Sequence, residues 1–132
     1  MLSPITLRQF AKLQARYPNA TLEPLASGAG LLTLPEFPLP AGWTSASTTV
    51  RFLVPNGYPG PSPDCFWASS GLRLANGGMP QNTADPNPIP DTPHQDLWFS
   101  WHVVDGALNW NPNRDDLLTY VSIINGRFAQ LQ

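Results

Sequence analysis

Proline constrains the fold of this chain more than any other residue type, because it accounts for 16 of the 132 residues. This share is more than twice the usual value of about 5%. Proline interrupts helices and central strands, so the prolines divide the chain into short segments. Two segments carry the spacing of apolar residues that is typical of an amphipathic helix, residues 4–17 and residues 113–130, and we expect a helix in each.

Both expected helices have recognisable start signals. Ser3 can cap the first helix and Pro4 suits its first position. Its apolar stripe consists of Leu7, Phe10, Leu13 and Tyr17. Asp115 and Asp116 are expected in the first turn of the second helix, where acidic side chains suit the helix dipole. Its apolar stripe consists of Leu117, Val121, Ile124, Phe128 and Leu131.

Short runs rich in β-forming residues lie between the two helices. Four of them are predicted to be strands: residues 20–25, 31–34, 44–54 and 72–75. Pro35, Pro38 and Pro40 are expected to break regular structure, and residues 76–96 to form a long loop. Hairpin-like spacing favours an antiparallel meander. We therefore expect one α+β domain over residues 1–132, with a helix, four strands, an irregular segment and a helix.

The composition argues against several classes of protein. The net charge is −2, and the seven basic residues are scattered, so no nucleic-acid or anionic-membrane surface is expected. No apolar run reaches the roughly 18 residues of a membrane span, and the N-terminus does not resemble a signal peptide, so we expect a cytoplasmic protein. Only 12% of the residues are charged, against about 25% in typical proteins, which favours contact with a partner.

One proline-rich segment carries most of the functional information. It runs from Val54 to Trp67 and contains the dipeptide Tyr58-Pro59. It resembles the flap that links the third and fourth strands of ubiquitin-conjugating enzymes. Downstream, Trp110-Asn111-Pro112 resembles the Trp-Ser-Pro motif of the same superfamily. More narrowly, four phrases resemble a prokaryotic branch, family E: residues 39–42, 54–59, 63–67 and 110–117. The resemblance covers residues 4–131.

The resemblance implies a role in a bacterial pathway that attaches ubiquitin-like proteins, with antiphage defence as one conceivable purpose. A conjugating protein of this kind receives or positions a ubiquitin-like protein supplied by an activating enzyme, which is expected to dock on the first helix. The tail of the ubiquitin-like protein would lie along the flap and residues 98–102. The residues expected to contact these partners are Tyr58, Pro59, Asp64, Trp67, Trp110 and Pro112.

The nucleophile of this superfamily is missing from its usual place. Related enzymes keep a cysteine eight residues before the tryptophan of Trp-Ser-Pro, and His102 occupies that position here. The His-Pro-Asn motif, which supplies an oxyanion-stabilising amide, is also missing. The only cysteine, Cys65, precedes Trp110 by 45 residues and follows the flap directly, where the resemblance places the start of the fourth strand. This departure puts thioester chemistry in doubt.

Three interpretations of the site remain open from the sequence. Cys65 is either a displaced nucleophile or a small buried core residue. Alternatively, strand-like alternation places Ser100 and His102 on one face, so that Ser100 could be acylated to an oxyester with His102 acting as a base or orienting a carbonyl. In the third interpretation no nucleophile exists, and the domain is a catalytically silent adaptor. An unrelated small β-rich binding domain is the remaining alternative.

No cofactor is expected. A lone cysteine excludes an internal disulfide and a cysteine-rich zinc site. His94, Asp96, His102 and Cys65 could be imagined as metal ligands, but their spacing matches no ligand motif, so no metal site is predicted. The sequence also lacks a glycine-rich phosphate loop and a nucleophile elbow.

Overall fold

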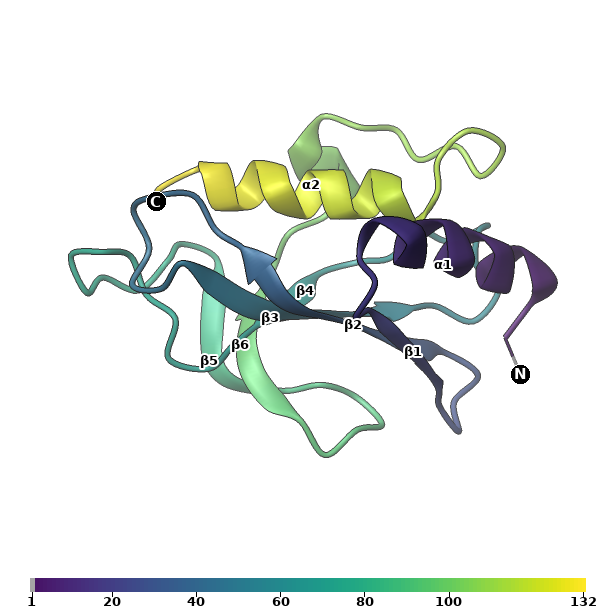
Figure 1. Ribbon diagram of the computed structural model, residues 1–132, viewed down its shortest axis with the longest axis horizontal. Coiled ribbons are helices and arrows are strands. Elements are labelled where there is room, and N and C mark those ends of the chain that lie inside the picture. Colours follow the sequence, from purple (N-terminus) through teal and green to yellow (C-terminus); the bar gives the residue numbers. More distant parts are fainter. Residues whose placement is uncertain (1) are drawn as a thin grey trace.

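The computed structural model describes residues 2–132 as two α-helices that cover one face of a six-stranded sheet (Figure 1). The helices are α1 (Pro4–Arg16) and α2 (Leu117–Ala129), and a short 3₁₀ helix, η1 (Val103–Gly106), precedes α2. The strands are β1 (Thr21–Pro24), β2 (Gly30–Pro38), β3 (Ser47–Val54), β4 (Phe66–Ala68), β5 (Thr83–Pro88) and β6 (Gln95–Phe99). The predicted α+β class with two helices is confirmed.

The sheet is antiparallel with the strand order β1-β2-β3-β4-β6-β5, so the prediction of a four-stranded meander is wrong. The first four strands are neighbours in sequence order, as a meander requires. The β5–β6 hairpin adds two more strands, and β6 is inserted between β4 and β5. As a result, the end of β6 lies beside the start of β4, which brings distant parts of the sequence together.

Three local predictions fail around the prolines. Strand β2 continues through Pro35 to Pro38, because a register shift between Leu34 and Phe37 accommodates the proline without a ladder bond. Residues 76–96 are not a single loop, since β5 and the start of β6 lie within them. Residues 72–75 are not a strand; they contribute only an isolated bridge between Leu74 and Trp43.

The two helices start as the sequence indicates, with one shift. The Ser3 hydroxyl accepts the backbone N–H of Thr6 and caps α1. Helix α2 begins at Leu117, four residues later than predicted, and Asp116 is its N-cap rather than a first-turn residue. Asp115 lies before the helix and is buried, where its carboxylate accepts the backbone N–H of Asn111. The carboxylates of Asp115 and Asp116 therefore hold the turn before α2 in place through hydrogen bonds, and do not act on the helix dipole alone.

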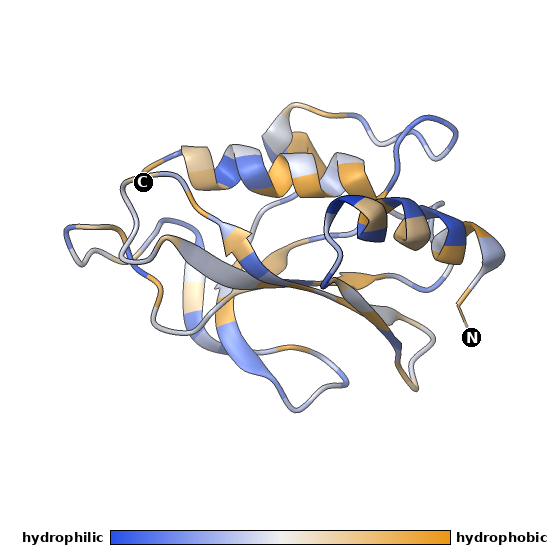
Figure 2. Cartoon of the chain, in the orientation of Figure 1, coloured by the Kyte–Doolittle hydropathy of each residue, from blue (hydrophilic) through white to orange (hydrophobic). Residues whose placement is uncertain are grey.

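The core lies between the helices and the sheet. Alternate residues of β3 point into it, whereas Arg51 and Leu53 face the opposite side of the sheet. Hydrophilic and hydrophobic residues alternate along both helices in Figure 2, as amphipathic helices require. Leu7 and Leu131 are exceptions to the predicted stripes, because about half of each side chain is exposed. No helix within residues 2–132 is long and apolar enough to span a membrane.

Candidate functional site

Cys65 is the last residue before β4, as the resemblance to conjugating enzymes implies, and its backbone conformation is unusual. Its φ of 63° lies in the left-handed region, which residues other than glycine seldom adopt. The backbone N–H of Cys65 donates to the carbonyl of Trp101 at 3.1 Å. The residue is only 8% exposed. This bond fixes the start of β4 against the chain that leaves β6.

His102 lies directly beside Cys65, although 37 residues separate them in the sequence. The Sγ of Cys65 is 4.0 Å from Nδ1 of His102. The same imidazole nitrogen is bonded to the carboxylate of Asp64. The Asp105 carboxylate accepts the backbone N–H of His102 at 2.8 Å, which holds the residue at the start of η1. We call Asp64, Cys65 and His102 the Asp–Cys–His cluster.

The electrostatics of the cluster keep its thiol protonated at rest. Burial raises the pKa of Cys65, and the nearby carboxylates of Asp64 and Asp105 raise it further. The hydrogen bond to Asp64 raises the pKa of His102 above its ordinary value. Because Nδ1 already donates to Asp64 when it carries a proton, it is not free to accept the thiol proton in this arrangement. The cluster therefore differs from a triad, in which the two imidazole nitrogens serve different partners.

We expect Asp64→Asn to lower the pKa of His102, because the substitution removes the carboxylate that stabilises the imidazolium. An NMR titration of the imidazole signals measures this shift, with His102→Gln assigning the signal. Because the folded-state pKa is raised, the contact stabilises the fold fully below the unfolded-state pKa. This stabilisation is lost as pH rises through the folded-state pKa.

Asp91→Asn serves as the matched control for this titration. Its carboxylate accepts the backbone N–H of Ser27 and lies in the turn between β5 and β6. The titration midpoint of His102 should be the same in this variant as in the wild type. An unchanged midpoint in Asp64→Asn would contradict the assigned contact.

Ser100 follows directly after β6, which ends at Phe99, so the regular strand does not extend to His102. Its backbone N–H donates to the carbonyl of Asn82 at 2.8 Å, which ties it to the start of β5. Among residues 2–132, the Ser100 hydroxyl has no hydrogen bond to His102. No side-chain hydrogen bond therefore joins the two candidates of the 98–102 segment within the described residues, whereas Cys65 and His102 are adjacent.

The segment between β3 and β4 is fastened to the chain that precedes α2. The indole of Trp110 donates to the carbonyl of Pro59 at 2.8 Å. The ring of Tyr58 lies 5.9 Å from that of Trp110, and its hydroxyl bonds to the side chain of Gln9 in α1. Tyr58 is 4% exposed, and burial raises its pKa, so it is a packing residue in this structure.

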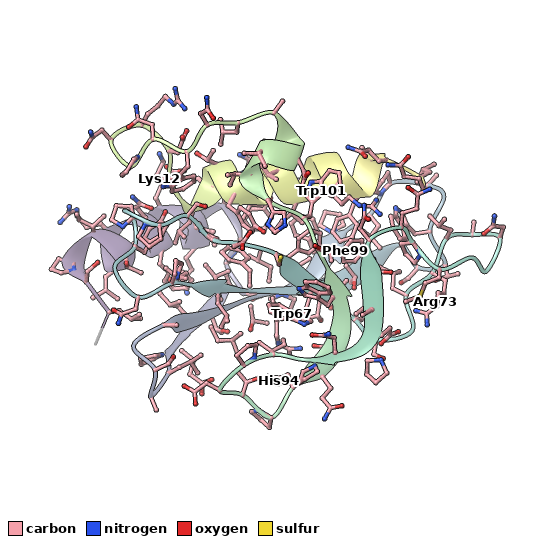
Figure 3. All side chains as sticks on the ribbon, turned by 180° about the vertical axis from the view of Figure 1, so that it is seen from behind. Lys12, Trp67, Arg73, His94, Phe99 and Trp101 are labelled. Atoms are coloured by element: carbon pink, nitrogen blue, oxygen red, sulfur yellow. The ribbon has the colours of Figure 1, made fainter. Side chains whose placement is uncertain are left out.

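Two other predicted contact residues lie apart from the cluster. Pro112 is exposed and lines a cavity of about 300 Å³ between α1 and the turn before α2. Trp67 packs with Leu31 and Ile89 in a small second apolar cluster. Figure 3 places Trp67 and His94 away from α2, whereas Trp101 and Phe99 lie beneath that helix. Of the four metal ligands imagined from the sequence, Cys65 and His102 lie together, whereas Asp96 pairs with Arg51 and His94 lies elsewhere.

Comparison with known families decides the assignment. Residues 13–130 match the family model for prokaryotic E2 family E, where E2 denotes a ubiquitin-conjugating enzyme. The chain belongs to prokaryotic E2 family E. No curated protein and no solved structure gives a significant match. The match covers β1 to β6 and all of α2, so this E2-like chain has both halves of the Asp–Cys–His cluster within the matched region.

Membership of prokaryotic E2 family E allows the Asp–Cys–His cluster to be compared with the usual nucleophile position of conjugating enzymes. The position eight residues before Trp110, where the resemblance to conjugating enzymes places a nucleophile, belongs to His102. The thiol of Cys65 lies 4.0 Å from that residue's imidazole. Sequence reasoning treated the two as competing candidates and did not connect Asp64 to His102. No sequence signal joins residues 38 positions apart; the connection follows from β6 pairing with β4.

Proposed function

We propose that this chain is the conjugating component of a bacterial ubiquitin-like modification pathway and that Cys65 accepts the ubiquitin-like protein. The observation that carries this proposal is the adjacency of Cys65 and His102 within an E2-like fold. The partners would be an activating enzyme and a ubiquitin-like protein, and the reaction would take place in the cytoplasm. The segment from Tyr58 to Asp64 would act as the flap over the tail of the ubiquitin-like protein.

The chemistry is a transfer between two thiols. Cys65 Sγ forms a bond to the terminal carbonyl carbon of the ubiquitin-like protein, and the bond to the cysteine of the activating enzyme breaks. The departing sulfur leaves as a thiolate, and the Cys65 proton must be removed. The imidazole of His102 is a base within reach: in the neutral tautomer with its proton on Nε2, Nδ1 no longer donates to Asp64 and can accept the thiol proton.

A catalytically silent adaptor is the second candidate, and two observations favour it. Cys65 is only 8% exposed, and burial raises its pKa, so little thiolate is present at neutral pH. The chain also lacks the His-Pro-Asn motif that supplies an oxyanion donor in related enzymes. Such an adaptor would bind the activating enzyme or the ubiquitin-like protein without forming a covalent bond.

Reconstitution separates the two candidates. The chain is mixed with the activating enzyme and ubiquitin-like protein encoded beside its gene, with ATP, and covalent products are separated by denaturing electrophoresis. We expect one adduct that thiols and hydroxylamine both release, because a thioester reacts with each. Binding without any adduct would exclude the acceptor function and support the adaptor.

The chemical lability of the adduct distinguishes the possible acceptor residues, and the single lysine of the chain makes the result easier to interpret. Lys12 is the only lysine, so an isopeptide bond to a side chain of this protein can form at one position only. A product that resists both thiols and hydroxylamine, and that disappears in Lys12→Arg, is self-modification and would not support the proposal. A hydroxylamine-labile product that resists thiols and disappears in Ser100→Ala would be an oxyester on that residue.

A further inference from the structure

We propose that the Asp–Cys–His cluster also binds a zinc ion, which prevents the thiol of Cys65 from acting as an acceptor. Three different donors converge there: a carboxylate oxygen, a thiol sulfur and an imidazole nitrogen, all within 4.8 Å of one another. They come from two segments, the residues before β4 and the residues after β6. The consequence for conjugation rests on the proposed function, whereas the binding site itself does not.

The distances suit a first-row transition metal. Zinc binds sulfur at about 2.3 Å and imidazole nitrogen at about 2.0–2.1 Å, so one ion can bridge donors that lie up to roughly 4.4 Å apart. The Sγ of Cys65 and Nδ1 of His102 are 4.0 Å apart, which is within this reach. Asp64 has an exposed side chain, so its carboxylate can rotate to complete a three-ligand set.

The donor set favours zinc over the common hard cations. Calcium and magnesium prefer oxygen ligands, whereas sulfur and imidazole select zinc and related metals. Three protein ligands leave a fourth tetrahedral position for water. Binding involves no change of oxidation state: the thiol proton of Cys65 is released to solvent, and any proton on Nδ1 of His102 moves to Nε2 or to solvent.

Zinc would compete directly with the acceptor chemistry. A thiolate that shares its lone pairs with the ion cannot attack a thioester, and Nδ1 of His102 cannot accept a proton while it is a ligand. Zinc would also replace the electrostatic arrangement that keeps Cys65 protonated, because the ion stabilises the thiolate. The chain could thus be held inactive by the metal and released when the metal is removed.

The test uses the chain alone, first stripped of metal with a chelator. Zinc is titrated against a chromophoric chelator, and cobalt is then bound in its place to detect a thiolate–cobalt charge-transfer band. We expect one zinc per chain and loss of the cobalt band in Cys65→Ser. Cys65→Ser and His102→Gln should each weaken zinc binding more than about tenfold, since a direct ligand contributes more than an outer-shell partner.

His94→Gln is the matched control, because the chain has only two histidines and His94 lies on the side of the sheet away from α2 (Figure 3). This variant should bind zinc as the wild type does. A second readout is the rate at which an aromatic disulfide reagent modifies Cys65, the only thiol, and we expect one equivalent of zinc to suppress it. Equal zinc affinity in the wild type and in Cys65→Ser, or unaltered thiol reactivity, would overturn the proposal.

The outcome of the zinc titration does not depend on the outcome of the reconstitution. The titration contains no activating enzyme, so a chain that does not bind zinc can still form the adduct. A chain that binds zinc but never forms an adduct would keep the metal site and lose the acceptor function.

Discussion

Replacing Cys65 with alanine is expected to eliminate the thiol-labile adduct, with a loss of at least about 100-fold in its rate of formation. The substitution removes the only sulfur nucleophile in the chain. His102 and Asp64 keep their contact with each other in this variant, so the change isolates the nucleophile from the rest of the cluster. The initial rate of adduct formation, measured by denaturing electrophoresis without thiols, is the readout.

Two companion variants sharpen this prediction. Ser100→Ala removes the alternative nucleophile and should leave the adduct unchanged, because Ser100 has no hydrogen bond to His102. Cys65→Ser should form an adduct slowly, and that product should resist thiols, since a serine hydroxyl is a weaker nucleophile and yields an oxyester. If Cys65→Ala retains the adduct while Ser100→Ala loses it, the assignment of the acceptor is wrong.

The adduct assay is interpretable only if the Cys65 variants fold. Alanine is smaller than cysteine and fits the same space, and neither residue is favoured at a φ of 63°, so the backbone cost is shared. We expect the unfolding free energy to change by no more than about 1 kcal/mol. Urea unfolding of each variant provides this check.

Of the substitutions described here, Phe128→Ala is expected to lower the free energy of unfolding the most, by about 3–5 kcal/mol. Phe128 is fully buried in α2, and its ring centroid lies 5.5 Å from those of Trp43, Phe66 and Phe99. Alanine would leave a cavity at the centre of this aromatic cluster, where the helix meets the sheet. A domain of this size has roughly 5–15 kcal/mol of stability, so the loss is a large fraction of the total.

Leu7→Ala is the matched control for Phe128→Ala, because Leu7 is 51% exposed on α1. We expect it to change the unfolding free energy by no more than about 0.5 kcal/mol. The midpoint of urea unfolding reports both changes. A Phe128→Ala variant as stable as Leu7→Ala would contradict the packing of α2 on the sheet.

Local patterns predicted the helices better than the strands. Ser3 and the spacing of apolar residues located α1 within one residue, because capping and amphipathicity are local properties. The strand predicted at residues 31–34 ends too early, because a proline such as Pro35 normally interrupts a strand. Only the pairing of β2 with β3 reveals the register shift that accommodates it. Strand β5 was missed because its sequence, Thr83–Pro88, contains two prolines and little β-forming character. Its hydrogen bonds to β6 override that weak propensity.

The candidate site was predicted in pieces. Spacing from Trp110 directed attention to His102, and the proline-rich segment directed attention to Cys65. Their adjacency depends on β6 being inserted between β4 and β5, which no local pattern indicates. For the same reason, the contact between Asp64 and His102 could not be inferred from the sequence.

The most direct test of the account is to locate the bond in the purified adduct. Proteolysis without thiols, followed by mass spectrometry, identifies the peptide that carries the terminal residues of the ubiquitin-like protein. We predict that the modified residue is Cys65. Attachment at Ser100 or Lys12, with Cys65 recovered as a free thiol, would contradict the account.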